Sequence, residues 1–397
     1  MTLSMFRPLT LAALALCGSG LQAQTLMQPS SRTDLTDADT LLWRAGLQWE
    51  HDSNVFKAPD AQAQSDRIAV ASAGLRINKP WSLQRLELDL GVDHYQYGRY
   101  SALDFTALNY NGTFRWAFTP RLHGNLTAER REYIDRFSDV SNGRINRRTE
   151  QNHGLDAEYE VGAAWRALAG VFEQRTTSSV DNLEPDATVR GGEIGARHEW
   201  RSGNSLSYRF RQGQGDYTGL PTAAGNFDER QHLLDLLWQA TGQVRVNGQL
   251  GWLQRDHDVQ PARDFSGWVG RLNATWALTG KTRLTGGLIR ELAAYQVADA
   301  SYYEGYRFFI APEWKPTAKT AVRLRLDHGQ RTYKGAPFVT TAAPREDRLN
   351  IAALALEWEP VRALRLMATV QRDERSSNRV GADYKANVWG LAAQASF

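Results

Sequence analysis

The chain has 397 residues, a formal net charge of +3, 42% hydrophobic residues and 23% charged residues. The near-neutral charge argues against a nucleic-acid-binding protein, and the single cysteine, Cys17, excludes a disulfide framework and a zinc site built from cysteines. No stretch of 18 apolar residues follows the N-terminus, which excludes a protein that crosses a membrane with helices.

The N-terminus has the pattern of an export signal. Arg7 precedes an apolar run over residues 9–16, and small and polar residues follow as far as Ala23. This pattern predicts a secretory signal peptide over residues 1–23. A lipoprotein signal ending at Cys17 is the weaker alternative, because Leu16 stands where such signals need a small residue. Residues 24–40 are polar and aperiodic, so we expect a flexible periplasmic segment before a folded domain over residues 41–397.

The folded domain alternates apolar and polar residues with a period of two. Leu86, Leu88 and Leu90 interleave with Glu87 and Asp89, for example. A period of two predicts β-strands with one apolar face and one polar face. The same pattern recurs in 113–118, 155–161, 206–211 and 322–327.

Tryptophans mark short turns between these strands. In most cases Pro, Gly, Asn or Ser follows within a few residues, as a tight turn requires. An amphipathic ring at a strand end is typical of a membrane interface, so we expect one periplasmic aromatic girdle. Its members are Trp81, Trp116, Trp165, Trp200, Trp238, Trp276, Trp314 and Trp358.

Counting strands from these turns gives an even number. Eight turns join sixteen strands, one strand precedes them at about 41–50, and one follows at about 383–397. We therefore predict an all-β fold: a transmembrane, antiparallel outer-membrane β-barrel of about 18 strands with short periplasmic turns and longer extracellular loops. A soluble secreted β-sandwich or propeller is the alternative. The longer loops are expected at 51–67, 131–150, 212–229 and 330–347.

The C-terminal strand carries a further indication. Trp389, Leu391, Ala393 and Ala395 alternate up to a terminal aromatic residue, Phe397. This pattern resembles the signal that outer-membrane assembly machinery recognises, and we predict that role for Phe397.

An 18-stranded barrel encloses an aqueous lumen unless something plugs it. The polar strand face would bring charges of both signs into this lumen, where they either guide a solute or neutralise one another and stiffen the wall. Neutralisation is the stronger expectation for any single residue. A mixed-sign wall suits a hydrated polyhydroxylated or weakly acidic chain. The lumen candidates are Arg115, Arg209, Arg211, Arg323, Arg325, Asp89, Asp156 and Glu158.

Two tyrosine groups and one loop are further candidates. Residues 131–150 are a candidate for a loop that folds inward and narrows the pore. The tyrosines at 95, 97 and 100, and those at 302, 303 and 306, can stack on sugars, but an extracellular girdle is the favoured reading.

No enzyme, metal or cofactor is predicted. The eight histidines have neither metal-ligand spacing nor a nucleophile elbow nearby, although a Ser–His pair assembled across strands would not show in spacing. Residues 52–54 resemble the start of a calcium loop, but the Gly and closing Glu are missing.

Several segments resemble one known family. They are Asp52–Pro59, Ser65-Asp66, Gly98–Ser101, Asp104-Phe105, Thr119–Leu122, Arg130–Glu132, Ser202–Leu206 and Gly215–Tyr217. Over essentially the whole mature chain they are similar to the EpsL-like outer-membrane barrel proteins of exosortase-associated exopolysaccharide operons in Gram-negative bacteria. That family usually has Arg where this chain has Lys57, which keeps the charge. The resemblance implies a part in assembling or exporting an extracellular polysaccharide and supplies no site residues.

Three functions follow from these observations. The first is an outer-membrane channel for polysaccharide export, whose partners are outer-membrane lipid, the polymer and periplasmic export or biosynthesis proteins. The second is a general or oligosaccharide porin for uptake. The third is a structural component that docks export partners through residues 24–40 and the short turns.

Overall fold

The computed structural model describes residues 40–134, 147–179, 186–218, 225–297, 300–336 and 343–397. The predicted signal peptide and most of the expected periplasmic segment lie outside these ranges, as does the centre of the 131–150 loop. Thr40, which we had placed in the flexible segment, is instead the first residue of the first strand.

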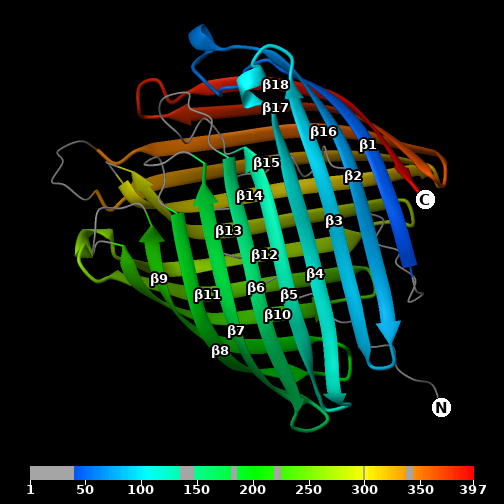
Figure 1. Cartoon of the computed structure of the whole chain (residues 1–397), viewed down its shortest axis with the longest axis vertical. Helices are drawn as coiled ribbons and strands as arrows, with labels where there is room; N and C mark the ends of the chain where they lie inside the picture. Colours follow the sequence, from blue (N-terminus) through cyan, green and yellow to red (C-terminus); the bar gives the residue numbers. More distant parts are fainter. Residues whose placement is uncertain (1–39, 135–146, 180–185, 219–224, 298–299, 337–342) are drawn as a thin grey trace.

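Eighteen antiparallel strands form one closed barrel (Figure 1). Their bounds are β1 Thr40–Asp52, β2 Asp66–Trp81, β3 Gln84–Tyr97, β4 Phe105–Thr119, β5 Leu122–Ile134, β6 Arg147–Glu160, β7 Trp165–Ser178, β8 Asp186–Glu199, β9 Ser205–Thr218, β10 Asn226–Gln239, β11 Val244–His257, β12 Phe265–Ala277, β13 Thr282–Val297, β14 Ala300–Thr317, β15 Thr320–Lys334, β16 Glu346–Val361, β17 Leu364–Ser377 and β18 Tyr384–Ser396. Three short 3-10 helices lie in the connections: η1 Asp60–Gln62, η2 Ser101–Leu103 and η3 Pro261–Arg263.

The predicted strand count is confirmed, and the closed sheet excludes the sandwich and propeller alternatives. Each strand pairs with its sequence neighbours, and β1 pairs with both β2 and β18. Such closure leaves no unpaired sheet edge. At the seam between β1 and β18, the backbone N–H of Trp43 donates to the carbonyl oxygen of Phe397 at 2.7 Å, and the N–H of Phe397 donates back at 3.0 Å.

The connections alternate between short turns and longer links, except that only two residues separate the bounds of β13 and β14. The β2–β3, β4–β5, β14–β15 and β16–β17 turns hold only two residues each, whereas residues 53–65 join β1 to β2. The strands extend further into the predicted loops than the sequence pattern suggested: β1 reaches Asp52, and β5 and β6 take up residues 131–134 and 147–150. Alternating polarity fades at strand ends, while backbone pairing continues there.

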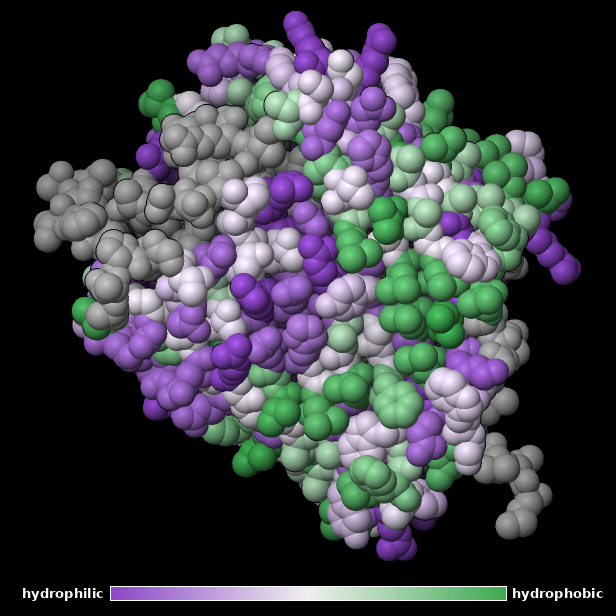
Figure 2. Space-filling model, in the orientation of Figure 1, coloured by the Kyte–Doolittle hydropathy of each residue, from purple (hydrophilic) through white to green (hydrophobic). Residues whose placement is uncertain are grey.

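The outward face of the barrel is an apolar surface. Leu47 is 69% exposed, Ile194 65% and Val370 54%, although each lies in the middle of a strand. Figure 2 shows hydrophobic residues over the wall nearer the short turns and hydrophilic residues towards the longer connections. Many large apolar side chains exposed along the strands indicate a surface that contacts lipid.

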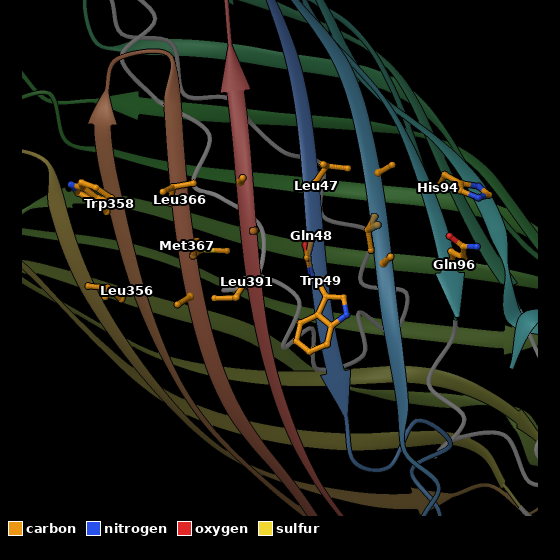
Figure 3. A pocket seen from close by; sticks show the side chains of 16 residues that line it. Leu47, Gln48, Trp49, His94, Gln96, Leu356, Trp358, Leu366, Met367 and Leu391 are labelled. Carbon is orange, nitrogen blue, oxygen red and sulfur yellow. The ribbon is translucent and has the colours of Figure 1, made fainter. Parts of the chain in front are cut away.

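Two grooves mark this outward face. One, of about 730 Å³, crosses the seam between Trp49 on β1 and Trp358 on β16, with Leu391 of β18 between them (Figure 3). The other, of about 630 Å³, crosses β9 to β15 over Gly248 and Gly270. Both are lined mainly by apolar residues of the outward face, and the lining of the second also includes the inward-facing Arg271, Ile289 and Arg307.

Among the described residues, no helix has the length and apolar character needed to cross a membrane.

Candidate functional site: the lumen wall

The eight lumen candidates all lie on the inward face of the strands. Each alternates with outward residues; Arg209 and Arg211, for instance, flank Phe210, and Leu206 and Tyr208 on the same strand are exposed. The inward register therefore follows the sequence pattern. What the pattern leaves open is the partner of each charge.

On β1 to β4 the inward charges are paired. Asp89 accepts hydrogen bonds from Arg44 of β1 and from Nε of Arg76 of β2, the latter at 2.9 Å. Arg115 of β4 donates to Glu87 of β3 at 2.9 Å. These contacts join neighbouring strands and satisfy half-buried charges, which is the neutralising role that we expected most often.

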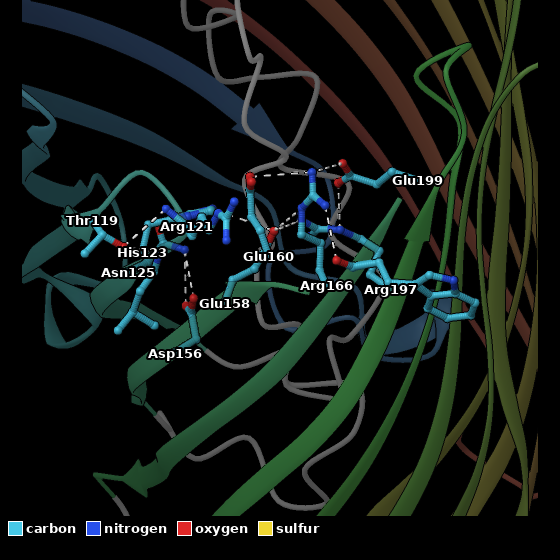
Figure 4. Close-up of polar contacts among 12 residues, drawn as sticks. Thr119, Arg121, His123, Asn125, Asp156, Glu158, Glu160, Arg166, Arg197 and Glu199 are labelled. Carbon is cyan, nitrogen blue, oxygen red and sulfur yellow. Dashed lines mark hydrogen bonds and ion pairs between the residues drawn. The ribbon is translucent and has the colours of Figure 1, made fainter. Parts of the chain in front are cut away.

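On β5 to β8 the pairs form a larger network, shown in Figure 4. Arg166, only 6% exposed, lies 3.7 Å from Glu158, 3.5 Å from Glu160 and 3.3 Å from Glu199. Glu158 also pairs with Arg197. Asp156 is held by the amide of Asn125 at 3.0 Å rather than by a cation. One guanidinium thus bridges three carboxylates near the short turns.

The remaining arginine candidates are also ion-paired. Arg209 donates to Asp235 at 2.8 Å, and Arg211 lies 3.1 Å from Glu193. Arg323 bridges Glu313 at 2.9 Å and Glu357 at 2.7 Å. Arg325 makes a two-point contact with Asp327 at 2.6 and 2.8 Å.

Positively and negatively charged side chains are unevenly distributed around the lumen. The inward face of β9–β15 is rich in cations, whereas its acidic residues are the five carboxylates Glu229, Asp235, Glu291, Glu313 and Asp327. On β5–β8 the acidic side chains outnumber the arginines. The lumen therefore has one basic wall. Its inward cations are Arg209, Arg211, Arg245, Arg255, Arg271, Arg283, Arg307, Lys315, Arg323, Arg325 and Arg331.

Two arginines of the basic wall differ from the rest. Arg271 and Arg307 form no hydrogen bond or ion pair within the described ranges, whereas Arg245, which also lacks a carboxylate partner, donates to Oε1 of Gln239 at 3.0 Å. Neither arginine is among the eight lumen candidates named from the sequence, and nothing in the strand pattern separates these two from the paired arginines. Only the three-dimensional assignment of partners does so.

A packed block closes the longer-connection end above β1 to β4. Val55, Ile68, Tyr97 and Leu103 are buried together, and Phe56 packs edge-on against Tyr100 at 4.8 Å. Most of the family-like segments between residues 52 and 105 meet in this block. These segments therefore have a packing role in the barrel.

The side chain of Asn54 ties this block to the seam. It is fully buried, and its Nδ2 donates to the carbonyl oxygens of Ala58 at 2.6 Å and of Lys385 on β18 at 3.0 Å. Asp52 contacts Lys57 at 2.6 Å and accepts the N–H of Asn54 at 2.8 Å. The resemblance of residues 52–54 to a calcium loop thus reflects a folded connection.

The predicted tyrosine girdle is wrong for most of its members. Tyr97 and Tyr303 are buried on the inward side, 8% and 4% exposed, and Tyr95 stacks on Phe105 with centroids 4.5 Å apart. Only Tyr306, 55% exposed, lies openly on the outward face. These rings pack against neighbouring strands, a contact that their position near strand ends does not reveal.

The eight tryptophans lie at the short-turn end of the barrel. Seven are 45–55% exposed on the outward side, whereas Trp116 is half-buried beside Phe118, with ring centroids 5.0 Å apart. His198 lies between Trp165 and Trp200 at 4.8 and 4.7 Å. No set of three or more His, Cys, Asp or Glu side chains in the described part of the chain is arranged to hold a metal ion.

Comparisons with known proteins show which family model and which solved structures this barrel resembles. The family model described as "Putative beta-barrel porin 2" matches residues 234–397, less than half of the chain. OpdK of Pseudomonas aeruginosa aligns over 90% of this chain and 99% of its own at a TM-score of 0.52 and 10% identity. OccAB4 of Acinetobacter baumannii aligns over 91% and 100% at a TM-score of 0.51 and 11% identity.

The chain has the fold of outer-membrane porins. No curated protein matches its sequence. The fold supports an outer-membrane location, as predicted. The comparisons give no support to the exopolysaccharide assignment, and the uptake alternative fits them better.

Proposed function

We propose that this chain is a passive outer-membrane channel that admits small polar solutes and prefers anions. The observation behind this proposal is the basic wall of β9–β15, in which cations outnumber carboxylates and two arginines, Arg271 and Arg307, have no hydrogen-bond or ion-pair partner within the described ranges. A surplus of fixed positive charge beside a narrow path raises the local concentration of anions. The tryptophans at the short turns would mark the periplasmic boundary of the membrane.

The similar porins support an anionic solute. One solved structure is OpdK with vanillate, and another is OccK2 of P. aeruginosa in complex with glucuronate, which aligns over 91% of this chain at 11% identity. Both ligands are organic carboxylates. Carboxylates pair with arginine in planar two-point geometry, and arginine is the main cation of this lumen.

Polysaccharide export is the second candidate. It rests on the sequence segments that resemble exopolysaccharide-operon barrels. The segments between residues 52 and 105 form the packed block beside the seam, so the resemblance reports how the barrel is closed rather than what passes through it. The third function, a structural component that docks export partners, depends on residues 24–40, of which the structure describes only Thr40.

Ion selectivity in planar bilayers tests the proposal. In a potassium chloride gradient we expect the purified full chain to show a reversal potential of anion-selective sign. The double substitution Arg271→Glu/Arg307→Glu should shift it towards cations. The same reversal at Arg209 and Arg211 is a poorer test, because it would also break contacts with Asp235 and Glu193.

A deletion strain separates the two candidates. Unchanged surface polysaccharide together with slower uptake of small organic acids would support the channel. Polymer retained in the periplasm of the deletion strain, with no conductance from the purified chain, would overturn it in favour of export.

A further inference from the structure

The basic wall contains one row in which two unpaired cations flank a single apolar side chain. In the sheet register, Arg271 of β12 lies directly opposite Ile289 of β13, and Ile289 lies directly opposite Arg307 of β14. All three face the lumen, because Trp268, Leu272, Tyr306 and Phe308 are exposed on the other face of the same strands. The two arginine backbones are separated by two strand spacings, about 10 Å.

The carboxylates around this row are already occupied. Asp235 receives Arg209 at 2.8 Å and the amide of Gln249 at 2.7 Å. Asp327 is held by Arg325 through two contacts. Glu291 lies 3.7 Å from Arg331. Each nearby anion thus has a cation of its own, and Arg271 and Arg307 carry the surplus.

Two half-buried guanidinium groups without counter-ions are costly, since burial removes water without supplying a partner. The residue directly opposite Arg307 on β15 is Gly329, which has no side chain. Each group can offer two parallel N–H donors to one carboxylate. The local surplus of two positive charges matches a ligand with two negative charges.

We propose that Arg271 and Arg307 form a binding station for a small dicarboxylate, whose apolar linker lies over Ile289. This inference rests on the proposed channel function and names the solute class of the same lumen. A solute with one carboxylate would leave one guanidinium unpaired, so the station should discriminate by charge as well as size.

Titration calorimetry on the full chain in detergent micelles tests the station without requiring conduction. The probes are succinate, with two carboxylates, and butyrate, with one carboxylate and the same number of carbons. We expect succinate to bind at least tenfold more tightly than butyrate. Arg271→Gln/Arg307→Gln should lower succinate affinity at least tenfold, because two charge-assisted contacts are lost.

Two further variants exclude a purely structural effect. Arg230→Gln removes a cation from the outward face of β10, where Arg230 lies between the buried Glu229 and Gln231, and should leave succinate affinity unchanged. Arg271→Lys/Arg307→Lys keeps both charges and should retain the preference for succinate at lower affinity. Equal binding of butyrate and succinate, or unchanged affinity in the glutamine variant, would overturn the station.

Conductance distinguishes failure of the station from failure of the channel. The chain could conduct chloride with anion selectivity while succinate neither blocks this current nor passes through the channel. That result would support the channel function and rule out the dicarboxylate station. Succinate binding without any current would leave the station and remove passive transport.

Discussion

Lys57 shows how one residue stabilises a long connection of this barrel. It adopts a positive φ of 51°, an uncommon conformation for a residue with a side chain. Its ammonium group contacts Asp52 at 2.6 Å, and both side chains are largely buried. Burial lowers the pKa of Lys57, but the carboxylates of Asp52 and Asp373 outweigh it and raise the pKa above the ordinary value.

We therefore expect Lys57→Met to lower the free energy of unfolding by about 3 kcal/mol, because Asp52 would be left buried without its cation. A raised folded pKa stabilises the protein fully below the unfolded value of about 10.4 and is lost only as pH rises through the folded value. The wild type should thus be equally stable at pH 7 and 9 as far as this pair is concerned. Urea unfolding in lipid vesicles measures both effects.

Lys385→Met is the matched control, since Lys385 is half exposed and lies 3.8 Å from the exposed Asp60. A similar loss of stability in both variants would mean that the buried pair has no special role.

At the scale of a strand, Gly124 shows why one position must lack a side chain. A Cβ at Gly124 of β5 would lie 1.9 Å from the carbonyl oxygen of Asp156 and 2.6 Å from Cζ2 of Trp116. The Asp156 atom belongs to the backbone of β6, so it cannot move without disturbing the ladder. By contrast, a Cβ at Gly91 of β3 would meet no atom within 4 Å.

Gly124→Ala should therefore cost about 3 kcal/mol of unfolding free energy, the upper part of the usual overpacking range, and Gly91→Ala should cost little. A heat-modifiability gel measures this difference, because it compares the fraction of folded barrel that remains in each variant. Equal behaviour would show that β5 and β6 are further apart than described.

The last strand offers a test of the assembly signal at Phe397. Its side chain is 72% exposed, while its backbone exchanges two hydrogen bonds with Trp43. Phe397→Ala keeps those bonds, so we expect the purified barrel to retain its unfolding free energy. If the aromatic ring is an assembly signal, the amount of folded protein in the outer membrane should fall several-fold. Normal membrane levels of Phe397→Ala would refute that role.

For the molecule as a whole, closure depends on β1 meeting β18. The register places Ala45 directly opposite Ala395, and Leu47 opposite Ala393. Opposite residues of an antiparallel pair have Cα atoms about 4.5–5.5 Å apart, within reach of a disulfide. Ala45→Cys/Ala395→Cys should thus cross-link under oxidation, which a gel-mobility shift detects.

Ala45→Cys/Ala393→Cys is the register control. Its two positions lie on the same face but are offset by two residues, about 7–8 Å apart, so it should cross-link poorly. Preferential cross-linking of the offset pair would show that the seam has a different register.

The strand count, the inward and outward faces and the position of the short turns could all be predicted from the sequence. These features are local: a period of two assigns each side chain to a face, and turn residues beside each tryptophan end each pair of strands. For the same reason the eight lumen candidates could be placed on the inward face from the alternation alone.

Which of these inward charges are already neutralised becomes evident only from the arrangement of the strands in space. Arg166 meets carboxylates from β6 and β8, and Arg323 meets Glu313 and Glu357 on the two flanking strands. Such partners depend on the register between strands, which a single strand's pattern does not contain. Arg271 and Arg307 are therefore indistinguishable from other lumen arginines in the sequence. They become a candidate site only when the closed barrel has assigned every neighbouring carboxylate to another cation.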